Sequence, residues 1–307
     1  MKRIILLVAF FLAITFHSAN AQYWSVWQKT HNITLGLSSD EKWAFFIQKN
    51  ETGVDNIYKV ELKTNAVTPV TNFTERPVLS GIVLFGKPAV VYARDAGTGD
   101  LFGGAPRVHL YRINITTTDP PVDFTPKDGS SSKKILGMAD NGRYVYYLSD
   151  RGPGSKTDTY RYDAAQYITE LALANDKDYW TLAWSHDQTQ LLLMDPKTQT
   201  LYKYSIESTD KQITDTNDIA FKGYKLSNKG NLSLNQKYIH YPIHREQGER
   251  VIELTTNNEL PLPEGAYDLI IGPKEASVLF VNMEGKVNKL YFYDIAKKTS
   301  KELTTIK

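Results

Sequence analysis

The sequence predicts an all-β protein built from repeated units, and three observations support this prediction. Tyr, Thr, Val, Ile and Phe occur in short runs separated by Asp, Asn, Gly, Lys and Pro, as in strands joined by tight turns. No stretch keeps an apolar period of 3.6 residues over three turns, and the best helical candidate, Asp163 to Asn175, is equally compatible with a strand. Two short patterns also recur along the chain.

The more regular pattern is a strand-like segment with tyrosine in its second position. It occurs as IYKVELKT, LYRINITT, TYRYDAAQ, LYKYSIES and LYFYDIAK, and RVIELTTN fits the same place without the tyrosine. The six marker positions are Tyr58, Tyr111, Tyr160, Tyr202, Val251 and Tyr291. Their spacing of roughly 40 to 50 residues is that of a four-stranded propeller blade.

The second pattern lies upstream of each marker and consists of a polar turn followed by apolar or aromatic residues. Its first copy is LSSDEKWAFF, and the further copies begin at Leu84, Met138, Ala183, Leu232 and Ile271. Each unit therefore contains an inner strand, a polar turn, a second strand, a loop, the marked third strand and an outer strand. A single four-stranded sheet has two apolar faces, and a radial arrangement of six sheets buries each face against a neighbour.

We therefore predict one domain over residues 22–307, a six-bladed β-propeller of four-stranded antiparallel blades. Aromatic residues alternate with polar ones from Gln22 to Thr34, so this segment is a hypothetical strand that closes the ring onto the last blade. Within LSSDEKWAFF, we expect Asp40 to bond the backbone of its own turn. We expect Trp43 to Phe46 to form a strand that is buried on both faces.

The first 21 residues have the pattern of a secretory signal peptide. Lys2 and Arg3 precede an apolar stretch from Ile4 to Phe16, and Ala19 to Ala21 form a small-x-small cleavage site. The apolar stretch is shorter than the ~20 residues of a membrane span, so we expect no membrane insertion after cleavage. An uncleaved anchor helix is the alternative. The absence of cysteine excludes disulfides and a lipid acceptor at the cleavage site, which favours a periplasmic or secreted protein of bacterial origin.

The charge of the chain does not favour binding to polyanions. The formal net charge of +2 includes Lys2 and Arg3, so the mature chain is near neutral. Charged residues of both signs are scattered, whereas nucleic acids and anionic membranes select clustered basic surfaces. We expect no nucleic-acid partner.

LSSDEKWAFF together with NIYKVELKTNAVTPVT resembles the TolB-type propeller repeat, also called the WD40-like or PD40 repeat. Blades of that family carry a Ser-Pro-Asp-Gly-like turn, a short apolar strand and an Ile-Tyr strand ending near Leu-Thr. The same repeat builds the N-terminal propeller of the prolyl oligopeptidase and dipeptidyl peptidase families, and YLSDRGPGSKTDTYRYD is similar to a blade of those peptidases. No copy here has the complete turn motif, and the fifth lacks the tyrosine. The resemblance implies the fold, while function must be argued from a site.

No pattern in the sequence indicates a catalytic centre. The Gly-x-Ser-x-Gly nucleophile motif is absent, and after the last repeat we expect no room for a hydrolase domain before Lys307. His240 and His244 fall in a predicted strand, where positions four apart are separated by ~13 Å, too far to share a metal ion. We predict no catalytic residue, no metal site and no cofactor. The alternative is the propeller part of a peptidase-like protein, or a hydrolase acting on peptides or glycans in the central channel.

The most variable segments are the loops between second and third strands, which in a propeller share one rim with the connections between blades. The longest span Ala93 to Arg107, Asp150 to Asp158 and Ile243 to Glu249, and the first holds Phe102 among glycines. That Phe102 packs against its own blade is the alternative to a binding role. We predict that this rim binds a protein or peptide, with an envelope-associated complex as one option. The candidate binding residues are Arg94, Asp95, Phe102, Arg107, Arg151, His244 and Arg245.

Overall fold

The computed structural model of the chain describes residues 33–97, 107–125, 133–138, 142–150, 157–185, 189–195, 197–198, 201–206, 213–215, 224–226, 237–242, 248–253, 255–256 and 258–307. Every regular element in these ranges is a β-strand, and the strands are β1 to β24. The predicted signal peptide, residues 1–21, lies outside the described residues. Residues 22–32 of the hypothetical closing strand also lie outside them.

The strands form antiparallel sheets, which we number I to VI in chain order. Sheet I contains β1 (Thr34–Leu37), β2 (Trp43–Lys49), β3 (Asp55–Glu61) and β4 (Val67–Pro69). Sheet II contains β5 (Val78–Val83), β6 (Ala89–Asp95), β7 (Val108–Asn114) and β8 (Val122–Asp123). Sheet III contains β9 (Lys133–Met138), β10 (Tyr144–Ser149), β11 (Asp158–Asp163) and β12 (Ile168–Leu173).

The remaining sheets come from the C-terminal half. Sheet IV contains β13 (Trp180–Ser185), β14 (Gln190–Met194), β15 (Leu201–Ser205), β16 (Ile213–Asp215) and also β17 (Tyr224–Leu226). Sheet V contains β18 (Tyr238–Pro242), β19 (Glu249–Glu253) and β20 (Asn258–Glu259). Sheet VI contains β21 (Tyr267–Ile271), β22 (Ser277–Glu284), β23 (Val287–Asp294) and β24 (Thr299–Ile306).

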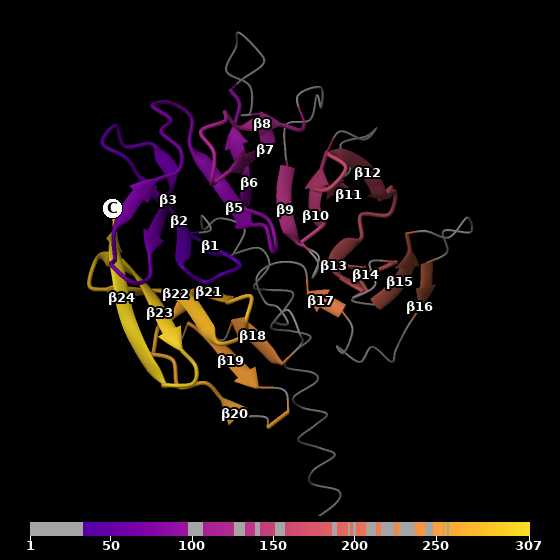
Figure 1. Cartoon of the computed structure of the whole chain (residues 1–307). Coiled ribbons are helices and arrows are strands. Elements are labelled where there is room, and N and C mark those ends of the chain that lie inside the picture. Colours follow the sequence, from indigo (N-terminus) through magenta and orange to yellow (C-terminus); the bar gives the residue numbers. More distant parts are fainter. Residues whose placement is uncertain are drawn as a thin grey trace, which may run out of the picture.

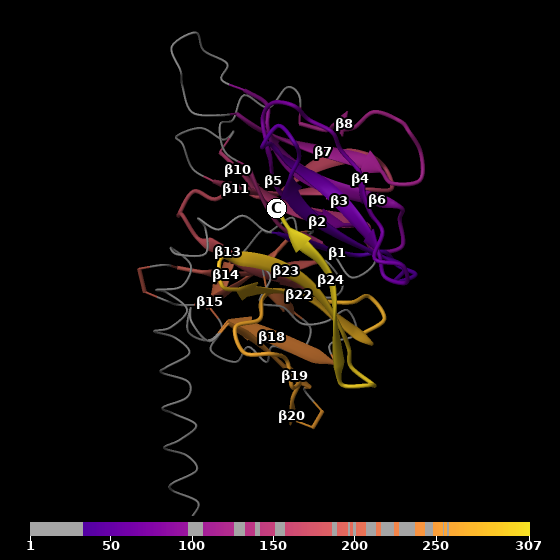
Figure 2. The same ribbon diagram turned by 90° about the vertical axis from the view of Figure 1, so that its left-hand side faces the viewer.

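The sheets follow one another round a common centre in chain order, as a propeller requires (Figure 1). Figures 1 and 2 both place sheet VI between sheet V and sheet I. Sheets I, II, III and VI each pair four consecutive strands in order. The predicted all-β class and the four-stranded antiparallel sheets are confirmed for these four, and Asp163 to Asn175 contributes β12 rather than a helix.

Sheets IV and V differ from the expected four strands each. In the chain, β17 occupies the place of the inner strand of the fifth unit, but it pairs with β13 of sheet IV, with Ala183 opposite Leu226. Sheet IV therefore has five strands, and the described part of sheet V has three. Pairing with β17 satisfies backbone groups along an edge of β13 that strand order alone would leave open.

The hydrophobic core lies between the sheets, and sheets I, II, III and VI each bury apolar residues against both neighbouring sheets. Phe45 packs toward sheet II in one cluster, whereas Ala44 and Phe46 pack against Leu279 of sheet VI in another. The expected two-sided burial of β2 is thus confirmed. Each large apolar side chain buried in this way contributes about 1.5–3 kcal/mol relative to exposure.

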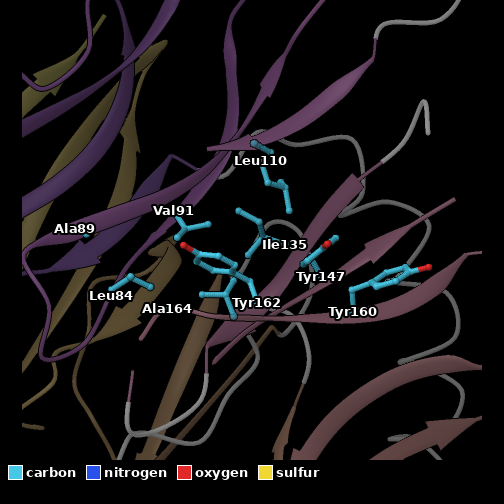
Figure 3. Close-up of a cluster of buried hydrophobic side chains, with 11 residues drawn as sticks. Leu84, Ala89, Val91, Leu110, Ile135, Tyr147, Tyr160, Tyr162 and Ala164 are labelled. Atoms are coloured by element: carbon cyan, nitrogen blue, oxygen red, sulfur yellow. The ribbon is translucent and has the colours of Figure 1, made fainter. Parts of the chain in front are cut away.

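Similar clusters join other neighbouring sheets in the described residues. Between sheets II and III, Val91 and Leu110 face Tyr147 and Tyr162 (Figure 3). Further clusters join sheet III to IV through Tyr146 and Trp184, and sheet V to VI through Val251 and Phe280. Together with the two clusters of sheet I, five seams between consecutive sheets contain an apolar core.

The polar turns between first and second strands also contact one another. The Ser39 hydroxyl accepts a hydrogen bond from the Gly86 amide of sheet II at 2.7 Å, and the Lys274 ammonium of sheet VI donates to the Asp40 carbonyl at 3.0 Å. Asp40 accepts from the amide of Lys42, as expected for a turn residue. A hydrogen bond from Ser38 lowers the pKa of Asp40 to about 2.

Candidate functional site

The rim opposite these polar turns brings together the loops between second and third strands and the connections between sheets. We call it the loop rim. The Asn50 side-chain amide, from a loop of sheet I, donates to the Phe73 carbonyl in the connection to sheet II at 2.8 Å. The Lys133 ammonium, which begins sheet III, donates to the Val108 carbonyl beyond the long loop of sheet II at 2.7 Å. The structure therefore joins the two kinds of segment that the sequence places on one rim.

Arg94, at the end of β6, fastens the connection between sheets I and II. Its guanidinium carbon lies 3.5 Å from the centre of the Phe73 ring. Two of its nitrogens donate to the carbonyls of Glu75 and Arg76, at 3.1 and 3.2 Å. A cation over an aromatic face and hydrogen bonds from a charged donor both stabilise this arrangement. Arg94 is thus held in one orientation at the loop rim.

Asp95 and Arg107 lie at the base of the long loop of sheet II. The Ala96 amide donates to the Arg107 carbonyl at 2.7 Å, and the Arg107 amide donates to the Gly97 carbonyl at 3.1 Å. The Asp95 carboxylate accepts from the Gly97 amide at 2.7 Å. Arg76 donates to the Ala96 carbonyl at 2.7 Å. These bonds close the loop base and leave the side chains of Arg76 and Arg107 exposed.

Gly97 has a steric role at this base. Its φ is +97°, and a β-carbon there would come within 2.5 Å of the Arg76 guanidinium. Only glycine accommodates both the backbone conformation and the close approach of Arg76. The local sequence therefore lets Arg76 lie across the start of the loop.

Of the seven candidate binding residues, the structure describes Arg94, Asp95 and Arg107 and brings them together at one loop base. The other four lie outside the described residues, namely Phe102, Arg151, His244 and Arg245. Their roles stay predictions.

Sequence reasoning missed a histidine–carboxylate pair below this loop. His109 Nδ1 lies 2.6 Å from an Asp123 carboxylate oxygen, and both side chains are mostly buried. Asp123 also accepts from the Thr125 amide at 2.8 Å, which fixes its orientation. Among the described residues, Asp123 is the hydrogen-bond partner of the His109 ring.

A positional signal in the repeat could have revealed this pair. The position two before the tyrosine marker is polar in several units, including Asn56, His109, Asp158 and Glu249. Asn56 accepts from the Phe73 amide at 2.7 Å, and Asp158 accepts from the Asn175 amide at 2.7 Å. This position therefore ties the third strand to the end of its own sheet or to the connection that follows.

An aromatic pair adjoins the same region. Tyr92 and Tyr111 are cross-strand partners whose rings stack with centres 5.4 Å apart. Burial raises the pKa of both hydroxyls, so both remain neutral at physiological pH. The Tyr92 hydroxyl is buried and has no hydrogen-bond partner among the described residues.

Two buried carboxylates lie where sheets V, VI and I meet. Glu249 accepts from the amides of Asp268 and Leu269, at 3.2 and 2.9 Å. Asp268 accepts from the Thr34 hydroxyl at 2.8 Å. Both carboxylates thus accept hydrogen bonds from residues near the start of an inner strand, β21 for Glu249 and β1 for Asp268. These contacts link neighbouring sheets.

The described ranges contain neither a metal-binding cluster nor a membrane-spanning helix. Within them, no three His, Asp or Glu side chains form a group that could hold a metal ion. No helix long and apolar enough to span a membrane occurs in the part of the chain that the structure describes.

No protein-family model matches the chain, and no curated protein matches it. Among solved structures, one from a structural and mechanistic analysis of two prolyl endopeptidases aligns with a TM-score of 0.50 at 9% identity, over 90% of this chain and 50% of that chain. TolB from Acinetobacter baumannii aligns with a TM-score of 0.39 at 15% identity, over 87% and 53%. A putative TolB from Agrobacterium tumefaciens aligns with a TM-score of 0.43 at 12% identity, over 89% and 80%.

The likeness is one of fold. The chain shares its fold with about half of the prolyl endopeptidase, so the resemblance seen in the repeat is confirmed at the level of fold. It spans about half the length of the Acinetobacter TolB and of the prolyl endopeptidase. At these identities, fold carries no function by itself.

Proposed function

We propose that this chain is a closed, six-bladed β-propeller that binds a protein or peptide partner on its loop rim and has no catalytic centre of its own. Six sheets in chain order and apolar cores at five seams support the blade number. The bond between Thr34 and Asp268 supports closure between the first and last sheets.

The observation that carries the binding role is the arginine group at the base of the long loop of sheet II. Arg94 is fixed on Phe73, and Arg76 is fixed on the Ala96 carbonyl, so neither has to be ordered when a partner arrives. Arg76 and Arg107 nevertheless remain exposed. Guanidinium groups that are already ordered before the partner binds lower the entropic cost of binding. They form charge-assisted hydrogen bonds with carboxylates of a partner.

We further propose that the mature protein is secreted, to the periplasm in a bacterium. The support is the charged head, apolar stretch and cleavage pattern of residues 1–21. N-terminal sequencing of exported protein should begin at Gln22. Retention of Met1 would contradict this part of the proposal.

The binding role is tested with two charge-matched baits. Arg76→Ala with Arg107→Ala removes two exposed cations from the loop rim, and Lys42→Ala with Lys63→Ala removes two from the opposite rim. Partners from periplasmic extract are quantified by mass spectrometry on each bait and on the wild-type chain. We expect a partner recovered on wild type and on the lysine variant, and at least about tenfold less on the arginine variant. Equal recovery on all three baits would contradict a role for this rim.

A second candidate is the propeller part of a peptidase-like protein, or a hydrolase acting in the central channel. The first of these two forms, the propeller part of a peptidase-like protein, is favoured by the alignment to half of a prolyl endopeptidase. The purified chain is tested for hydrolysis of proline-containing peptides and of glycosides. Hydrolysis that is abolished by replacing a residue of the central channel would support this candidate over the binding role.

A further inference from the structure

The outer strands of the sheets differ in how well their open edges are protected. Natural proteins shorten edge strands or place charges on them, because unpaired backbone groups otherwise recruit another strand. The outer strands of four sheets have only two or three residues, namely β4, β8, β16 and β20. Two are longer, β12 with six residues and β24 with eight.

Of the two long edges, only β24 carries a basic residue. Lys301 and Glu302 are both exposed on it, and Glu302 pairs with Lys289. On β12 the single charged residue is Glu170, which is bonded to Arg161 at 2.7 Å. Within the described residues, β12 pairs only with β11, so its outer edge is open.

The open edge of β12 also presents apolar side chains to solvent. Ile168 is 44% exposed and Leu171 is 43% exposed, and Tyr167 just before the strand is 61% exposed. Across the seam, Val122 on the outer strand of sheet II is 60% exposed. These are four of the six large apolar side chains that are exposed in the described part of the chain.

A cation without an anion lies beside this edge. The Arg112 guanidinium lies over the Tyr167 ring, 4.8 Å from its centre, and Arg112 is the cross-strand partner of Val122. In the described residues Arg112 forms no ion pair, and its Nε has no hydrogen-bond acceptor. Hydrogen bonding from Arg112, with the charges of Arg112 and Lys87, lowers the pKa of Tyr167. The neighbourhood of β12 is therefore apolar and positively charged.

We propose that the outer edge of β12 binds an extended, acidic segment of a partner protein by strand addition. Backbone groups of the segment pair with the open edge of β12, and its apolar side chains cover Ile168 and Leu171. A carboxylate of the segment neutralises Arg112 across the exposed Tyr167 ring. This surface is separate from the loop rim, so either can fail without the other.

Charge decides between a foreign segment and a second copy of this chain. In a two-fold pair of copies the β12 edge meets itself, and the carboxylate it brings, Glu170, is already bonded to Arg161. Arg112 would then remain without an anion. An acidic partner satisfies both the open edge and the cation.

The test uses synthetic peptides and the full chain. A fluorescent peptide of about eight residues, alternating valine with glutamate and threonine, is titrated with purified protein while its anisotropy is followed. Two control peptides replace glutamate with lysine, or methylate alternate backbone nitrogens. We expect saturable binding of the acidic peptide, at least about tenfold weaker binding of the lysine peptide, and no binding of the methylated peptide.

Matched variants assign the site. Leu171→Lys places a protecting charge on the exposed edge and should weaken binding at least about tenfold, whereas Thr305→Lys on exposed β24 should leave it unchanged. Unfolding curves check that both variants fold. No saturable binding up to about 1 mM, or equal binding to Leu171→Lys, would overturn the proposal. A wild-type dimer that Leu171→Lys converts to a monomer would also overturn it, in favour of a second copy.

Discussion

The Thr34 hydroxyl donates a hydrogen bond to the backbone carbonyl of Asp268 at 2.6 Å and also lies 2.8 Å from the Asp268 carboxylate. The two residues are 234 positions apart, at the start of β1 and near the start of β21. Both are buried. This contact joins the first sheet to the last through polar groups, beside the apolar seam that contains Phe46 and Leu279.

Replacing Thr34 with valine should weaken that junction. Thr34→Val keeps the shape of the side chain but removes the hydroxyl donor, so the Asp268 carbonyl and carboxylate lose their contacts with that hydroxyl. The amide of residue 34 still donates to the Asp268 carboxylate. We expect a loss of about 1–3 kcal/mol in the free energy of unfolding, measured by urea denaturation. Thr305→Val, on an exposed position of β24, is the control and should change it by less than about 0.5 kcal/mol. Equal effects would show that the buried contact contributes nothing specific.

Two glycines in equivalent turns should respond differently to alanine. Gly86 has φ of +68° and open space around its α-carbon, whereas Gly142 has φ of +65°, and a β-carbon on Gly142 would overlap the Phe85 carbonyl oxygen. Gly86→Ala should cost about 1 kcal/mol through backbone strain alone. Gly142→Ala should cost at least about 1 kcal/mol more, because the turn must move away from sheet II. Similar thermal unfolding of the two variants would contradict this close approach.

Asp163 should make stability depend on acid pH. Burial by itself raises the pKa of Asp163, but Arg143, 2.7 Å away, and the amides of Ala165 and Gln166 outweigh it and lower the pKa. A lowered folded-state pKa gives stability that is present above the unfolded value near about 4 and is lost as the pH falls through the folded value. Asp163→Asn should therefore destabilise the protein at pH 7 by about 1–3 kcal/mol, and by less at about pH 3.

Asp294 provides the control for that pH dependence. It holds the position in sheet VI that Asp163 holds in sheet III, three residues after the marker tyrosine. Its side chain is 26% exposed and bonds Lys297. Because solvent screens this pair, Asp294→Asn should change urea unfolding less than Asp163→Asn at neutral pH. A larger effect at Asp294 would contradict the importance of burial.

The Tyr92 hydroxyl should be dispensable for stability. It is buried and has no hydrogen-bond partner among the described residues. Tyr92→Phe removes a polar group that gains nothing from burial, so the free energy of unfolding should stay the same or rise by up to about 1 kcal/mol. Thr71→Val is the contrasting variant. The Thr71 hydroxyl donates a hydrogen bond to Asn56, so its removal should lower the free energy of unfolding. A destabilised Tyr92→Phe would reveal a bound water as partner of the hydroxyl.

Local patterns predicted much of the fold. Every marker position from Tyr58 to Tyr291 lies in the third strand of its unit, because a strand buried on both faces needs apolar residues at fixed positions. The long loop of sheet II between Asp95 and Val108 was also recognisable, since no strand pattern crosses it. The pairing of β17 with β13 was not recognisable from the sequence. Strands pair through backbone groups that every residue carries, so side-chain patterns do not specify which edge β17 joins.

The candidate site was predictable only in part. The sequence indicated Arg94 and Arg107 through loop length and charge, but not that Arg94 lies on Phe73 of the preceding connection. The pairing of His109 with Asp123 and the exposed edge of β12 were equally hidden. Each depends on which surfaces meet after the strands are paired.

The sequence by itself determined the strand content, the repeat and the order of the units, because alternation, turn residues and period act over a few residues at a time. Only the tertiary structure decided that Thr34 meets Asp268, that Arg76 lies across Gly97, and that Arg112 has no anion beside β12 among the described residues. These relations join segments far apart in the chain. They follow from the packing of whole sheets, which no short pattern specifies.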